Sequence, residues 1–191
     1  MNYIKILSFS ITINICSYSF AMEEKAFELA LTACEMCYHN RDDAAFVFAK
    51  SLVDKHKDDS ALTQSLKEYM SFCRVSDKYR EEAVENANEV IKISSDQLYV
   101  GVAWYNKSSY AYYISEDENA LTYSAIALKI LGKIPDTEPK GIQYYRKVYE
   151  FNCHSLRAWV YKASNEMEKA AEEESLASSK KDEFIKHVET K

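Results

Sequence analysis

AWYNKSSYAYYISEDENALTYSAIALKIL, residues 103–131, has the clearest helical pattern in the sequence. It contains five Tyr, places Ala at helical-turn spacing and has neither Gly nor Pro. This pattern predicts two helices, 98–114 and 117–132, separated by the polar segment SEDEN. Its tyrosines either pack in a core or form a binding surface, and the two interpretations lead to different functions.

The rest of the chain has the same helical character. Only three Gly and two Pro occur among its 191 residues, whereas a β-rich fold needs many turn residues of these types. We therefore predict an all-α fold, with Asp77, Ser95 and Ser115 as candidate N-caps. The predicted helices are 23–39, 42–56, 60–75, 78–94, 98–114, 117–132, 139–164 and 166–188.

Eight helices in short alternation suggest four hairpins, and the second helix of each carries an Ala followed by an apolar residue seven positions later. Seven residues are two helical turns, so both members of a pair lie on one face. A small side chain there lets a neighbouring helix approach closely. The leading alanines are 38, 37 and 50 residues apart. The four pairs are Ala45 and Leu52, Ala83 and Val90, Ala120 and Ala127, and Ala170 and Ala177.

The segment 101–134 resembles a tetratricopeptide repeat. Trp104 stands where that family has its signature Trp, and Ser108 stands where it has a small residue. Ala120 and Ala127 match the two small residues of its second helix. The resemblance implies that the hairpins stack into a right-handed superhelix, an α-solenoid, as one domain over residues 22–191. The other three hairpins are degenerate, and the residues that fit are Ala33, Ala45, Ser71, Ala83, Ala158, Tyr161, Ala170 and Ala177.

The resemblance also implies a concave groove lined by the first helix of each hairpin. The groove residues that it implies are Tyr105, Ser109, Tyr112, Tyr113, Tyr38, Phe72 and Trp159. Helical geometry supports part of this grouping, because positions 105, 109 and 112 fall on one stripe. Tyr buries a large apolar area with few torsions to freeze, which suits a groove that binds a protein or peptide segment. Alternatively, these rings pack against the next hairpin.

Residues 1–21 have the pattern of a cleavable signal peptide. A Lys precedes an apolar run, which ends on Ser19-Phe20-Ala21 with small residues at the two positions that signal peptidase inspects. The run is too short and too polar for a membrane span, so we expect export to the periplasm or the exterior, with no integral span after cleavage. Cleavage removes Lys5 and no acid, which changes the net charge from −6 to −7. Because the chain is acidic and has no basic stripe, we do not expect it to bind nucleic acid.

Four cysteines remain after cleavage, an even number in a compartment that permits disulfides. One expectation is a disulfide from Cys34 or Cys37 to Cys73, and the alternative is free thiols packed as small apolar groups. Cys34, Cys37, His39 and Cys73 could together bind zinc, but a second paired-ligand motif is missing. We therefore expect no metal and no cofactor.

Catalytic motifs are missing from the sequence. The three Gly are isolated at 101, 132 and 141, so neither a Gly-rich nucleophile turn nor a phosphate loop is present. The carboxylate rows Glu82, Glu85 and Glu89, and Glu172 to Glu174, are typical of solvated helix faces. We expect a non-enzymatic interaction module. Two alternatives are a structural subunit that assembles by self-association, and an uncharacterised metal-binding or catalytic protein.

Overall fold

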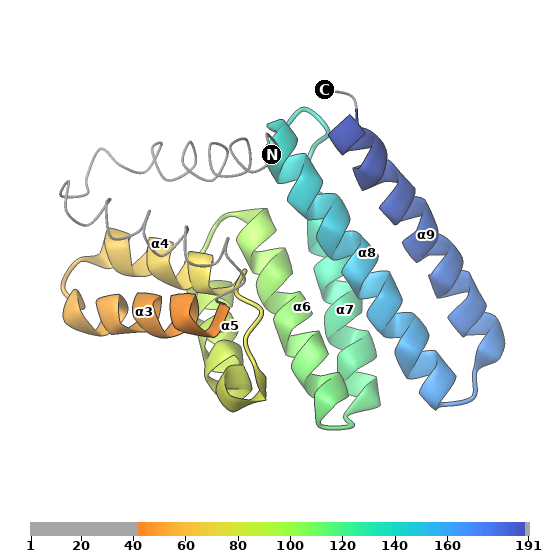
Figure 1. The fold of residues 1–191 in the computed structure, drawn as a ribbon, viewed down its shortest axis with the longest axis horizontal. Helices are drawn as coiled ribbons and strands as arrows, with labels where there is room; N and C mark the ends of the chain where they lie inside the picture. Colours follow the sequence, from red (N-terminus) through yellow and green to blue (C-terminus); the bar gives the residue numbers. More distant parts are fainter. Residues whose placement is uncertain (1–41, 190–191) are drawn as a thin grey trace. The chain divides into compact units, whose positions relative to one another are not determined.

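The computed structural model describes residues 42–189, and this part of the chain is all-α (Figure 1). The prediction of an all-α fold is therefore confirmed for the described residues. They divide into two compact units, with the boundary between Ser94 and Ser95. The elements are α3 (Asp42–Lys55), α4 (Ser60–Met70), the 3-10 helix η2 (Asp77–Tyr79), α5 (Arg80–Ile93), α6 (Gln97–Tyr113), α7 (Asp117–Leu131), α8 (Lys140–Ala163) and α9 (Met167–Glu189).

The first unit packs α3 against α4, and α4 against α5. Its core is built from apolar residues at helical spacing on α3 and α4, which buries one face of each helix. The Asp59 carboxylate caps the start of α4 by accepting from the backbone N–H of Leu62 at 3.0 Å. The buried core residues are Ala45, Phe46, Ala49, Leu52, Leu62, Leu66, Met70 and Cys73.

Helix α4 ends at Met70, five residues before the predicted end, and this is a correction. The next backbone N–H groups, from Ser71 to Cys73, bond to carbonyls three residues back, which tightens the chain out of the α-helix. Asn86 of α5 explains why the helix can stop here. Its buried amide donates to the Lys67 carbonyl at 2.9 Å, a carbonyl that a continuing α-helix would satisfy itself.

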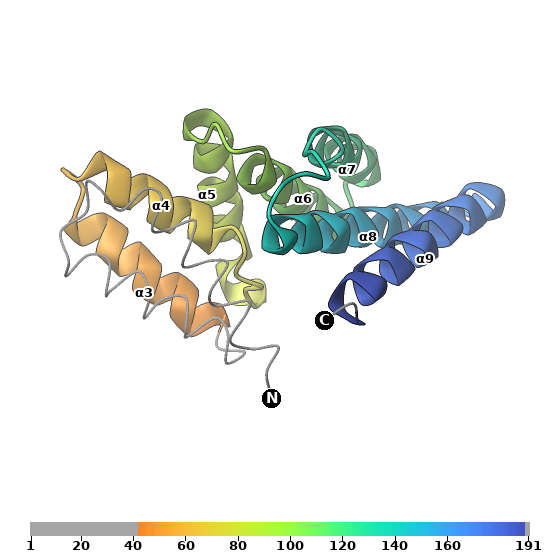
Figure 2. The same cartoon turned by 90° about the horizontal axis from the view of Figure 1, so that it is seen from above.

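The second unit contains α6 to α9, and α8 and α9 lie side by side along their lengths in both views (Figure 2). Helix α6 also packs against α7 and α8. Small residues make this close packing possible. A Cβ on Gly101 would lie 2.7 Å from the Leu131 side chain, and the buried Ser108 hydroxyl donates to the Ala120 carbonyl at 2.7 Å. The buried alanines of this unit are Ala103, Ala111, Ala120, Ala127, Ala158, Ala170 and Ala177.

The same turn joins α6 to α7 and, fifty residues further along, α8 to α9. Ser115 and Asn165 have φ of 62° and 60°, the left-handed conformation that ends many helices. In the first turn, Glu116 N–H bonds to the Ala111 carbonyl at 2.8 Å, and Ser115 N–H bonds to the carbonyl of residue 112 at 3.1 Å. The second turn repeats both bonds at the same two distances between residues 166 and 161, and between 165 and 162. Both are Schellman motifs.

None of the three predicted N-caps holds that position in the structure, which is a further correction, and the N-cap of α5 is Tyr79. Ser115 ends α6 instead of capping α7, and Glu116 occupies the N-cap position of α7. Asp96 caps α6, where its carboxylate accepts from the Leu98 backbone N–H at 2.8 Å, and Ser76 precedes η2. The exact first and last residues of a helix depend on local hydrogen bonds, so composition predicts them less well than it predicts the helix itself.

Candidate partner-binding surface

Two aromatic pairs join α6 to α8 along the face where the groove was predicted. Tyr105 meets Tyr149 edge-on with ring centroids 5.4 Å apart, and Tyr112 meets Trp159 with centroids 6.5 Å apart. The pairs occur in the same order along both helices, so α6 and α8 run in the same direction. The structure therefore brings three predicted groove residues, Tyr105, Tyr112 and Trp159, into one row.

This row contains both packed and exposed aromatic rings. Tyr105 and Tyr112 are half-buried and pack against a core formed by Ala111, Ala120, Leu156 and Val160. Trp159 and Tyr113, in contrast, are 55% and 50% exposed. Ser109, on the same stripe of α6, is half-buried. The inner part of the row is thus supported by the core, while the outer rings face solvent.

The remaining predicted groove and disulfide residues belong to the first unit or lie outside the described residues. Phe72 belongs to the first unit and lies in the turn after Met70, not on a helix, where it is half-buried. Tyr38, Cys34 and Cys37 lie outside the described residues, so their roles and the disulfide stay predictions. Cys73 is buried in the core of the first unit. The candidate surface that the structure supports is therefore the α6–α8 row alone.

Trp104, which was predicted to match the signature Trp of the repeat, packs between α6 and α7. Its ring is 5.4 Å from that of Tyr123, and the Lys107 ammonium lies 4.7 Å and 4.8 Å from the two ring centroids. Burial lowers the pKa of Lys107, and the two rings stabilise its charge by cation–π attraction. Trp104, Lys107 and Tyr123 thus form a packed contact between α6 and α7.

A polar cluster binds α8 to α9 and to α7, and the sequence did not predict it. The buried Glu173 carboxylate accepts from Arg157 Nε at 2.6 Å and lies 2.7 Å from His154 Nδ1. Arg157 also donates to the Leu121 carbonyl at 3.1 Å. Glu173 was predicted to lie on a solvated row without a His or Arg beside it, and this was wrong. A row of three glutamates contains no signal that its middle member faces inward.

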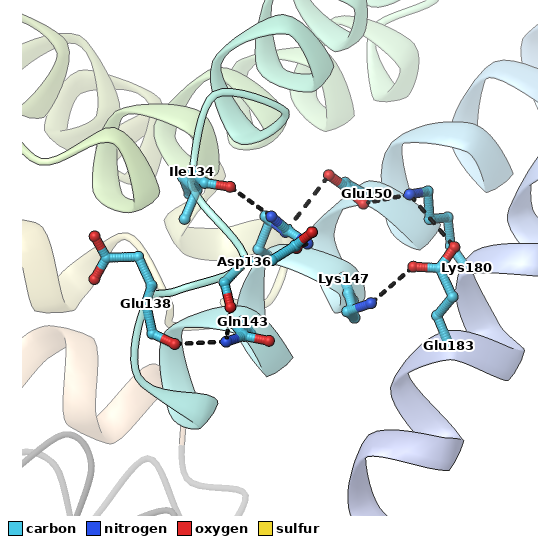
Figure 3. Close-up of polar contacts among 9 residues, drawn as sticks. Ile134, Asp136, Glu138, Gln143, Lys147, Glu150, Lys180 and Glu183 are labelled. Carbon is cyan, nitrogen blue, oxygen red and sulfur yellow. Dashed lines mark hydrogen bonds and ion pairs between the residues drawn. The ribbon is translucent and has the colours of Figure 1, made fainter.

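A second polar cluster fixes the connection between α7 and α8 (Figure 3). The buried Arg146 donates to the Ile134 carbonyl and to Asp136, both at 2.5 Å. This contact lowers the pKa of the Asp136 carboxyl. Arg146 thus anchors a proline-containing connection that has no regular structure of its own. Gln143 adds a bond from its amide to the Glu138 carbonyl at 2.6 Å.

The same cluster continues from α8 to α9. Lys180 lies 2.9 Å from the buried Glu150 carboxylate, and Lys147 donates to Glu183 at 2.8 Å. Burial lowers the pKa of Lys180, but its contacts with Glu150 and Glu183 outweigh burial and raise the pKa overall. The Lys147 contact lowers the pKa of Glu183. All of these charges are paired within the protein, which is the arrangement expected of structural ion pairs.

Within residues 42–189, no group of three or more His, Cys, Asp or Glu side chains is arranged to hold a metal ion. The zinc alternative rested on Cys34, Cys37 and His39, which lie outside that range, so it is not tested. The described helices also include none that is long and apolar enough to cross a membrane. A scan against protein-family models, a search of curated proteins and a search of solved structures each found no match.

Proposed function

We propose that this chain is an exported, tetratricopeptide-like module that binds a protein or peptide segment across the α6–α8 row. The observation that carries the proposal is the exposed Trp159 held against Tyr112 of the neighbouring helix. Trp and Tyr dominate binding energy at protein interfaces because they bury much area and lose little side-chain entropy. A surface in which such rings are pre-positioned by a core loses less entropy on binding.

The repeat character of the second unit supports this proposal. The two Schellman turns repeat at the same spacing as Ala120 and Ala170, and both alanines are buried. Ser108 and Ala158, the small residues of the two first helices, are buried as well. These agreements favour two related hairpins stacked with their first helices adjacent. That arrangement is the one in which first helices line a shared groove.

Affinity capture with a matched pair of variants tests the proposal. The wild type, Trp159→Ala and Leu176→Ala are each immobilised and exposed to the proteins of the compartment to which the chain is exported. Leu176 is also exposed, on α9, and provides the control for loss of a large apolar side chain. We expect a partner that the wild type and Leu176→Ala retain and that Trp159→Ala loses. A partner retained equally by all three would show that the surface is misassigned.

Two further measurements address the remaining parts of the proposal. Sedimentation across a wide concentration range separates a partner-binding module from a self-assembling subunit. A shift to dimers that Trp159→Ala abolishes would assign the surface to self-association instead. Mass spectrometry of the N-terminus of the protein recovered from its source tests export, and the expected mature chain begins at Met22.

A further inference from the structure

One end of the second unit collects exposed apolar side chains. The Tyr112–Trp159 pair places the C-terminal ends of α6 and α8 next to each other, and the turns that follow them lie at the same end of the unit (Figure 1). Besides Trp159 and Tyr113, this end carries Ile114 and Met167, which are 41% and 57% exposed. Four of the eight large apolar residues exposed in the described chain therefore occur at these two turns.

The same two turns are acidic. Residues 111–118 and 159–169 contain five acids and two lysines. Both lysines are already paired within the protein: Lys162 with Glu174 at 2.5 Å, and Lys169 with Glu166. The acids are Glu116, Asp117, Glu118, Glu166 and Glu168, and the four glutamates are exposed. The exposed rings and the Met thus have a negative border with no free positive charge among these residues.

Helix α6 itself contributes almost no charge to this surface. Lys107 is the only charged residue in Gln97–Tyr113, and its ammonium lies against the rings of Trp104 and Tyr123. On α8, the two basic side chains near Trp159 are paired within the protein: Arg157 with Glu173 at 2.6 Å, and Lys162 with Glu174. The unpaired charges near the exposed rings are therefore acids of the two turns. Tyr and Trp ring faces add to their effect, because they also attract cations. An acidic segment would be repelled by this surface, whereas a basic one would be attracted to it.

We propose that the partner of this surface is a cationic amphipathic segment, with large apolar side chains that contact Trp159 and Tyr113. Its Lys or Arg side chains pair with Glu116, Glu118 and Glu168, whereas Glu166 is already paired with Lys169. The inference rests on the proposed function, because it assigns the charge class of the segment that the α6–α8 row binds. The negative border gives selectivity and faster association, while the aromatic side chains provide most of the affinity.

Three synthetic peptides of about 18 residues, or five helical turns, test the charge class. One combines Lys with a Leu stripe, the second combines Glu with the same stripe, and the third combines Lys with Ser in place of Leu. Binding is followed by the fluorescence of Trp159 in a Trp104→Phe variant, which has one tryptophan. If that variant does not fold, dye-labelled peptides and fluorescence anisotropy on the wild type give the same comparison.

We expect only the Lys/Leu peptide to bind, with an affinity that falls as salt is raised. Trp159→Ala should weaken this binding by about thirtyfold or more, as at a typical hot spot. Glu118→Gln with Glu168→Gln should weaken it by about two- to fivefold per charge. Glu81→Gln with Glu85→Gln removes the same charge from exposed positions of α5 and should leave the affinity unchanged.

Different outcomes separate this inference from the proposed function. If the Glu/Leu peptide binds as well as the Lys/Leu peptide and binding still needs Trp159, the charge class is wrong but the binding surface stands. If Lys/Leu binding responds equally to both pairs of Gln substitutions, the attraction is to net charge alone and the inference is overturned. If no peptide binds, the inference is also overturned. The capture experiment with Trp159→Ala then decides the proposed function independently.

Discussion

Replacing Glu173 by Ala should destabilise the second unit far more than replacing either neighbouring glutamate. The Glu173 carboxylate is 8% exposed and accepts a charged hydrogen bond from Arg157 at 2.6 Å, with His154 at 2.7 Å. Removing one partner of a buried ion pair costs about 3–5 kcal/mol, because the other charge stays buried without compensation. In the variant, Arg157 retains its hydrogen bond to the Leu121 carbonyl and its cation–π contact with the Tyr161 ring, 5.7 Å away. We therefore place the loss of stability at the lower end of this range, about 3 kcal/mol.

Urea unfolding followed by tryptophan fluorescence measures this loss in the right part of the chain. Both tryptophans, Trp104 and Trp159, belong to the second unit, so the signal reports on that unit. The midpoint should fall for Glu173→Ala while the slope stays constant, as expected for a change in stability alone. The controls are Glu172→Ala and Glu174→Ala. Both side chains are exposed, and each change should cost less than about 1 kcal/mol. A loss at Glu173 no larger than in the controls would refute the reasoning.

Three further predictions concern the packing and turns of the second unit. Gly101→Ala should lower the thermal midpoint. The added methyl group would overpack against Leu131 at a cost of about 1–3 kcal/mol, which exceeds the roughly 1 kcal/mol gained in helix propensity. An unchanged or raised midpoint would contradict this. Ser115→Gly should raise the thermal midpoint, because Gly adopts the left-handed conformation without the steric cost that Ser has there, up to about 1 kcal/mol. Asn165→Gly should raise it less, because Asn tolerates that conformation. Equal effects of the two substitutions would contradict this explanation. Burial raises the pKa of the Cys153 thiol, so iodoacetamide should label it only in the unfolded chain, as read by peptide mass mapping.

The sequence predicted the helices of the second unit well because their periodicity is strong and their breaks are polar. The predicted range 139–164 agrees within one residue at each end with Lys140–Ala163. The end of α4 was not predictable in the same way. It depends on Asn86, whose amide donates a hydrogen bond to the carbonyl of Lys67, nineteen residues earlier in the sequence. A local pattern does not contain a tertiary hydrogen bond.

The candidate site was predicted in part for a related reason. Positions 105, 109 and 112 share a stripe by helical geometry, and the structure places Tyr105 and Tyr112 beside rings of α8. Which ring is exposed depends on how α6 packs against α8, and that packing involves Ala111 of α6 with Leu156 and Val160 of α8. Glu173 shows the same limit: whether a carboxylate faces solvent or an arginine depends on the rotation of α9 against α8.

The two hairpin connections of the second unit have the same backbone conformation, because both are Schellman turns. YISEDE and ASNEME, residues 113–118 and 163–168, share only two identical positions, yet they form the same backbone with the same hydrogen bonds. One turn could therefore be transplanted into the other hairpin without altering how the helices leave it. The internal symmetry of this unit is therefore clearer in its backbone hydrogen bonds than in its amino-acid sequence.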